Sequence, residues 1–207
     1  MRSMSVNVYK ADELSDSAQS EAHINWTADG YGWHSDNEKA LEEFAKIFPV
    51  KITGWEYGGQ YAHVTFELES QFEYDDNPDM APQRLATYIY NNYYNDIVKG
   101  KYFSLWSKTE KSERNPSVGK LKSRHSKVMF ESCCPLTGYC VDEDLLQPIF
   151  EFLKKPYDTT LNDLMNKCLQ AWAKSCDDDF NGSLTLEAFL DSAEANDYEF
   201  YEDGRMV

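Results

Sequence analysis

The sequence lacks any hydrophobic run long enough to cross a bilayer. A transmembrane helix needs about 20 consecutive, mostly apolar residues, and the 207-residue chain contains no such stretch. The apolar segment of a secretory signal peptide is also missing from its N-terminus. We therefore expect a protein without a membrane partner that stays in the cytoplasm of the cell that makes it.

Positive charge is scarce. The chain has 20 Lys and Arg against 36 Asp and Glu, a formal net charge of −16. This charge exceeds what a small domain needs for solubility, and it makes direct binding to nucleic acid phosphates unfavourable over most of the surface. Two interpretations stay open: a solvated acidic surface, or a surface that attracts a basic protein which normally holds DNA or RNA.

Recognisable catalytic motifs are absent as well. The chain has no nucleophile elbow, no phosphate-binding loop and no His-Glu-x-x-His motif, and its histidines are scattered. We expect no enzymatic activity and no cofactor. An enzyme with a dispersed acidic site would instead need a concave pocket with converging carboxylates of perturbed pKa.

Cysteines are few and not arranged in Cys-x-x-Cys pairs. The five are Cys133, Cys134, Cys140, Cys168 and Cys176. An odd set with two adjacent members is not typical of a secreted disulfide framework. A zinc site that uses His125 with the first three is possible by residue type, but buried, reduced thiols are the favoured interpretation.

Periodicity predicts an α+β fold, with a small antiparallel sheet packed against several α-helices in one domain of residues 1–207. The part from about residue 142 is expected to be helix-rich. The predicted helices span about 15–28, 35–48, 82–98, 142–153, 161–176 and 185–194, with Ser15 and Asp142 as N-caps and a disturbance at Pro148. Strands are predicted near 6–9, in a hairpin over 51–69, near 127–131 and at 198–201.

One local pattern resembles a calcium loop. Asp177, Asp179 and Asn181 occupy the first, third and fifth positions of an EF-hand-like segment, and Gly182 the sixth. The position of the bidentate Glu is taken by Ala188. A calcium-binding interaction module is therefore the alternative function, and a helix–turn–helix connection in which Thr185 starts the next helix is the alternative structure.

Acidic clusters form the remaining signal. The candidate partner-binding residues are Asp75, Asp76, Asp79, Asp177, Asp178, Asp179, Glu199, Glu202 and Asp203. Carboxylates interleaved with aromatic residues, as around Tyr198, can imitate the spacing of phosphates. The basic residues are concentrated in segment 99–127, whose role the sequence does not indicate.

The segments 12–18, 134–140 and 196–205 resemble uncharacterised small acidic proteins of phages and prophages. This resemblance implies an origin in a mobile element, and by analogy an anti-CRISPR or anti-restriction protein of the DNA-mimic kind. The function expected is inhibition of a host defence protein, a CRISPR effector or restriction enzyme, in the host cytoplasm. No functional residue is carried over, and the oligomeric state is not indicated.

Overall fold

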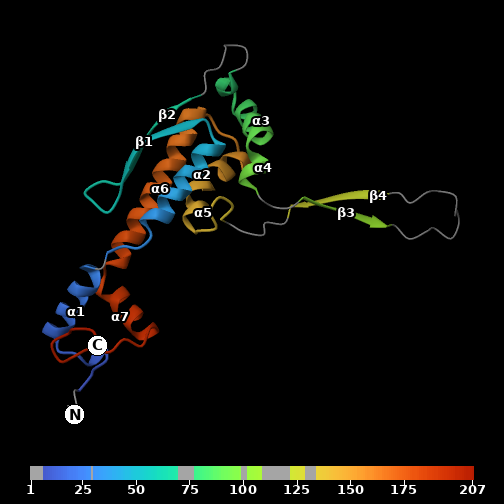
Figure 1. Ribbon diagram of the computed structural model, residues 1–207. Helices are drawn as coiled ribbons and strands as arrows, with labels where there is room; N and C mark the ends of the chain where they lie inside the picture. Colours follow the sequence, from blue (N-terminus) through green and yellow to red (C-terminus); the bar gives the residue numbers. More distant parts are fainter. Residues whose placement is uncertain (1–6, 29, 70–76, 99–101, 109–121, 129–133) are drawn as a thin grey trace.

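The computed structural model describes residues 7–28, 30–69, 77–98, 102–108, 122–128 and 134–207 (Figure 1). These ranges contain helices and two antiparallel hairpins, so the predicted α+β class is confirmed. The helices are α1 (Asp16–Ala28), α2 (His34–Ile47), α3 (Pro82–Asn92), α4 (Tyr94–Ile97), α5 (Val141–Lys154), α6 (Leu161–Ser183) and α7 (Leu186–Ala195); the strands are β1 (Val50–Glu56), β2 (His63–Leu68), β3 (Tyr102–Lys108) and β4 (Lys122–Val128). None of the described helices has the length and apolarity to span a membrane.

Helix α6 is the long central element of the main body, flanked by α2, α5 and the β1–β2 hairpin (Figure 1). Its apolar residues recur every three or four positions, and Leu164, Cys168 and Trp172 are completely buried. A fully buried large apolar side chain stabilises a fold by about 1.5–3 kcal/mol. The Trp172 indole also donates to the Asn37 carbonyl at 3.1 Å, which fixes α2 against α6.

The β1–β2 hairpin confirms the alternation predicted for residues 51–69. Val50 pairs with Leu68 and Glu56 with His63, with a register shift between Ile52 and Gly54. Val64 faces the core, whereas its neighbour Thr65 is exposed. Strand β2 is held on α6 by the Gln170 side chain, which donates to the Val64 carbonyl at 3.0 Å.

A second hydrophobic cluster joins the two ends of the chain at the lower end of Figure 1. We call residues 7–28 and 184–207 the terminal module. Its buried residues are Ala11, Leu14, Ala18, Ala22, Phe189, Ala193 and Phe200. The single-domain prediction stays a prediction, because the described residues pack into two clusters, one of which is formed by this module alone.

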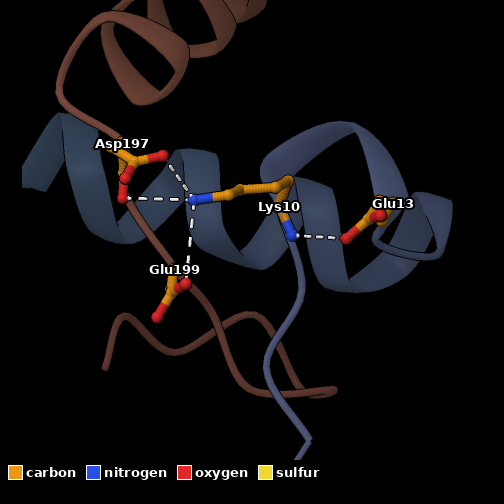
Figure 2. A network of polar contacts seen from close by, with 4 residues as sticks. All are labelled: Lys10, Glu13, Asp197 and Glu199. Carbon is orange, nitrogen blue, oxygen red and sulfur yellow. Dashed lines mark hydrogen bonds and ion pairs between the residues drawn. The ribbon is translucent and has the colours of Figure 1, made fainter.

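Polar contacts close the terminal module around Lys10 (Figure 2). The Lys10 ammonium lies 2.6 Å from an Asp197 carboxylate oxygen and 3.8 Å from one of Glu199, and its backbone N–H donates to Glu13 at 2.9 Å. Strands were predicted at 6–9 and 198–201. Within the described residues they are reduced to the isolated bridges of Phe200 with Tyr9 and Met206, because the chain reverses directly after Phe200, in a turn where the Gly204 N–H donates to the Tyr201 carbonyl at 2.9 Å.

Three further elements differ from the sequence prediction: one helix and two strands. The helix expected over 82–98 is interrupted at Tyr93, where φ is −123°. The Tyr93 ring contacts Phe48 and its hydroxyl bonds that of Tyr88 at 2.8 Å, so tertiary contacts override the helical pattern. Strand β3 was missed, because that segment was interpreted by its charge. Strand β4 begins earlier than the strand predicted near 127–131, and residues 129–131 lie outside the described ranges.

Candidate functional site

The first predicted acidic cluster has one described member. Asp75 and Asp76 lie outside the described residues. Asp79 is half-buried, and its Oδ1 accepts a hydrogen bond of 2.7 Å from the backbone N–H of Leu161. An acceptor at this point satisfies one of the unpaired N–H groups of a helix start. Asp79 therefore acts structurally, by capping α6.

The second cluster lies in a helix and not in a loop, so the loop geometry of an EF-hand is not found here, and calcium binding stays an untested alternative. Asp177, Asp179 and Asn181 lie within α6, which continues to Ser183. Thr185 then caps α7 by accepting from the Ala188 N–H at 3.2 Å, as the alternative structure predicted. Among the described residues, no group of three or more His, Cys, Asp or Glu side chains is placed to hold a metal ion.

Helix α6 continues because its acidic residues find partners both within the helix and in neighbouring segments. Asp177 accepts the Gly58 N–H at 2.8 Å and the Asn181 amide at 3.1 Å. Asp178 pairs with Lys174 one turn earlier. Asp179 accepts a hydrogen bond from the Tyr31 hydroxyl. These contacts stabilise helical geometry at residues whose types favour a turn when isolated.

The third cluster is partly neutralised by local ion pairs. Glu199 lies near Lys10, and the Asp203 carboxylate lies 2.9 Å from Nε of Arg205. Glu202 is exposed. Exposed pairs of this kind contribute little to stability, but they reduce the negative charge that this end of the molecule presents to a partner.

A cavity of about 350 Å³ brings three carboxylates together. The sequence analysis had singled out only one of them, Asp179. It lies where the start of α2, the start of α5 and the second half of α6 meet. Asp36, Asp144 and Asp179 line it, one from each helix, together with Trp33, Tyr139 and Ser175. We call this cavity the aromatic–acidic pocket.

Each carboxylate of the pocket is held by a hydroxyl group. The Ser175 hydroxyl donates to Oδ2 of Asp144 at 2.6 Å, and the Tyr31 hydroxyl donates to Oδ2 of Asp179. Desolvation, with Asp179 as the next cause, raises the pKa of Tyr31. A hydrogen bond with the Asp36 carboxylate raises the pKa of Tyr139. Both phenols therefore remain protonated donors near neutral pH.

No Lys or Arg in the described part of the chain forms an ion pair with these three carboxylates. The described ammonium group of Lys174 is bound to Asp178 instead. The pKa of Lys174 is raised first by its hydrogen bond with Asp178 and to a smaller extent by the charges of Asp177 and Asp144, so the pocket keeps negative charge that Lys174 offsets only in part. Such a site favours a cationic ligand, because carboxylates against an apolar wall are less screened than carboxylates in water.

Aromatic rings form the outer wall of the pocket. Trp33 is 55% exposed and Tyr139 36% exposed, and their ring centroids lie 6.3 Å apart in an edge-to-face arrangement. Large exposed aromatic rings beside carboxylates are typical of sites that receive cations. The wall is thus open to a ligand from solvent.

Asp142 fixes the loop that carries Tyr139. Its completely buried carboxylate accepts the backbone N–H groups of Leu136 at 3.0 Å, Thr137 at 2.7 Å and Gly138 at 3.1 Å. The sequence predicted Asp142 as an N-cap, but α5 begins one residue earlier and continues through Pro148. The carboxylate therefore organises the preceding turn, and so positions one wall of the pocket.

A buried polar network supports the inner side of the pocket. The Asn37 amide donates to the hydroxyls of Tyr31 and Tyr57, both at 3.2 Å, and Nδ1 of His34 bonds the Tyr57 hydroxyl at 2.6 Å. Satisfied networks of this kind hold side chains in one arrangement. The pocket is therefore largely formed before any ligand enters it.

The described cysteines are free thiols, as predicted. Cys134, Cys168 and Cys176 are buried and Cys140 is exposed at the pocket rim. Burial raises the pKa of both Cys168 and Cys176, so these thiols are unreactive. Cys133 and the His125 side chain, which the zinc hypothesis also needs, lie outside the residues whose side chains are described.

Converging carboxylates are also what an enzyme with a dispersed acidic site would need. No histidine lines the cavity in the described part of the chain. The hydroxyl of Ser175 donates to Oδ2 of Asp144 at 2.6 Å. The arrangement offers carboxylate acceptors to a cation.

Comparison with known proteins adds no relative, because no family model, curated protein or solved structure matched the chain. The interpretation of the pocket therefore depends on its own geometry. In the sequence, the one local sign of the pocket is the spacing of Ser175 and Asp179, four residues apart and so on one helix face.

Proposed function

We propose that this protein binds a basic protein surface, of the kind that normally holds nucleic acid, and blocks it. The observation that carries this proposal is that Asp36, Asp144 and Asp179 line one aromatic-walled pocket, and none of the three forms an ion pair with a Lys or Arg of the described residues. The formal net charge of −16 supports it, because such a charge steers a basic partner toward the molecule.

Steering and anchoring have separate origins in this proposal. Exposed carboxylates across the surface raise the association rate, and salt screens them. The pocket supplies a partly desolvated anchor, and loss of an anchor acts mainly on the dissociation rate. An inhibitor that competes with DNA or RNA needs both the steering charge and the anchor, because nucleic acid is itself densely charged and is attracted to the same basic surface.

The specific form of the proposal is a phage-type inhibitor of a host defence protein, either a CRISPR effector or a restriction enzyme. Its support is the acidic charge of the chain; the resemblance of three segments to small acidic phage proteins stays an expectation from the sequence, because no known protein matched the chain. In this proposal the inhibitor acts in the host cytoplasm, uses no cofactor and catalyses no reaction.

Capture from a host lysate tests the proposal. Three immobilised forms are compared: the wild type, a pocket variant (Asp36→Asn, Asp144→Asn, Asp179→Asn) and a control variant (Glu21→Gln, Glu187→Gln, Glu194→Gln). The control changes three exposed carboxylates of the terminal module, so both variants lose three negative charges. We expect the wild type and the control to enrich the same nucleic-acid-binding protein, and the pocket variant to lose it.

The captured protein is then assayed for nuclease activity with and without the wild-type inhibitor. Enrichment of no nucleic-acid-binding protein by the wild type would contradict the proposed function. Equal enrichment by all three forms would show that the pocket is not the anchor.

A further inference from the structure

We propose that the aromatic–acidic pocket receives the guanidinium group of a single arginine side chain. This inference rests on the proposed function, since the arginine would belong to the basic partner. It assigns to the pocket a ligand of defined chemistry, which an acidic surface alone does not specify.

The pocket wall offers a stacking surface. Trp33 is more than half exposed although its ring is large and apolar, and it stands edge-to-face with Tyr139. A cation within about 6 Å of an indole face gains about 0.5–1 kcal/mol at an exposed site, and more when desolvated. Guanidinium groups are weakly hydrated and planar, so they stack on such faces more readily than ammonium groups do.

The carboxylates leave acceptors free for the ligand. In Asp144 and Asp179, Oδ2 accepts the hydroxyl of Ser175 and of Tyr31, respectively. Oδ1 of Asp144 and Oδ1 of Asp179 accept no hydrogen bond from a described residue. The hydroxyls therefore orient the carboxylates and leave one oxygen of each to accept a donor from outside.

The distribution of acceptors favours arginine over lysine. Asp36, Asp144 and Asp179 project from three different helices, so a ligand that contacts more than one of them needs donors in several directions. Guanidinium carries five N–H donors in a planar fork, whereas ammonium carries three on a single atom. Only guanidinium can bond carboxylates at two edges while its face stacks on a ring.

The pocket is large enough for one arginine side chain. The cavity volume of about 350 Å³ lies at the lower end of the range of about 300–1,000 Å³ found for ligand pockets. A folded segment would not enter it. The partner would therefore present a projecting arginine and contact the rim with the rest of its surface.

Titration followed by NMR tests the inference, with the indole N–H signal of Trp33 as the readout, assigned with Trp33→Phe. The probes are N-acetyl-arginine methylamide, its lysine counterpart and its neutral citrulline counterpart. We expect the arginine probe to shift the Trp33 signal with saturation, the lysine probe to bind about tenfold more weakly, a difference of about 1.4 kcal/mol, and the citrulline probe not to bind.

The variants used for capture serve as controls. The pocket variant should lose the response to the arginine probe, and the control variant should keep it. Equal affinity for the arginine and lysine probes, or a response that survives in the pocket variant, would overturn the inference. The proposed function can fail separately, because a pocket that selects arginine in a protein that captures no basic partner refutes the function alone.

Discussion

Replacement of Gly204 by alanine should separate the C-terminal segment of the terminal module from α1. A Cβ atom at this position would lie 2.1 Å from the Ala18 carbonyl oxygen and 3.2 Å from the Ala22 nitrogen. Both are backbone atoms of a helix, so neither can rotate away. The φ of Gly204 is also +87°, a conformation that L-residues with a side chain adopt at a cost of about 1–2 kcal/mol.

The stability cost of Gly204→Ala can be judged from the movement that the new side chain requires. To remove the overlap, the C-terminal segment has to retreat from α1 by more than 1 Å, which exposes Ala18 and Ala22. Strain and lost packing together should cost about 3–5 kcal/mol. The module is held by three large buried side chains, Leu14, Phe189 and Phe200, each worth about 1.5–3 kcal/mol before the entropy of ordering the chain. The substitution should therefore open the module.

Hydrogen exchange measured by mass spectrometry can detect this opening. Peptides from 11–28 and 186–207 should lose protection in Gly204→Ala, while peptides from 161–176, in the main core, should keep it. The matched control is Gly182→Ala, where a Cβ meets no atom within 4 Å and the helix should gain up to about 1 kcal/mol. Wild-type protection of the terminal peptides in Gly204→Ala, or equal loss in 161–176, would refute the reasoning.

Three further predictions concern other parts of the molecule. Asp142→Ala leaves three backbone N–H groups without their acceptor. It should lower the free energy of unfolding by about 2–4 kcal/mol and weaken binding of the arginine probe. An unchanged midpoint of denaturation would argue against the role of Asp142 in holding the loop. Lys10 lowers the pKa of Asp197 from its ordinary 3.8, so their contact should stabilise the module above that pH and be lost as pH falls through the lowered pKa. Lys10→Met should therefore reduce exchange protection at 7–13 at neutral pH, and this effect should shrink as the pH falls below 3.8. An effect that does not change with pH would contradict it. In a Cys133→Ser protein, a thiol reagent should modify Cys140 first, and the arginine probe should slow that reaction; faster labelling of buried Cys168 would be inconsistent with the structure.

The sequence predicted the elements whose own residues determine them. The stripe from Leu161 to Cys176 required a buried helical face, and the alternation around Val64 required a strand with one buried side. Ser15 was expected to cap α1, and the Ala18 N–H donates to its hydroxyl at 3.3 Å. In each case the decisive signal lies within one short segment, where periodicity reports burial directly.

The remaining features depend on contacts between segments far apart in the chain. Residues 177–182 have the types of a turn, but Asp177 is held by Gly58 of the β1–β2 connection and Phe180 packs on the Tyr31 ring at 5.3 Å, so the helix continues. Asp142 was expected to cap a helix because a helix begins there. The backbone N–H groups that its carboxylate accepts instead belong to the turn before the helix. The pocket was missed because its carboxylates come from three helices that only the tertiary fold brings together.

The central claim is that the aromatic–acidic pocket anchors a basic surface that otherwise holds nucleic acid. Displacement of a labelled oligonucleotide from the captured partner, followed by fluorescence anisotropy, measures this directly. We expect the wild type and the Glu21, Glu187 and Glu194 control to displace the oligonucleotide at similar concentrations, and the Asp36, Asp144 and Asp179 variant to need at least about a hundredfold more, a difference of about 2.7 kcal/mol. Equal displacement by the two variants would contradict the claim, because charge alone would then explain the binding.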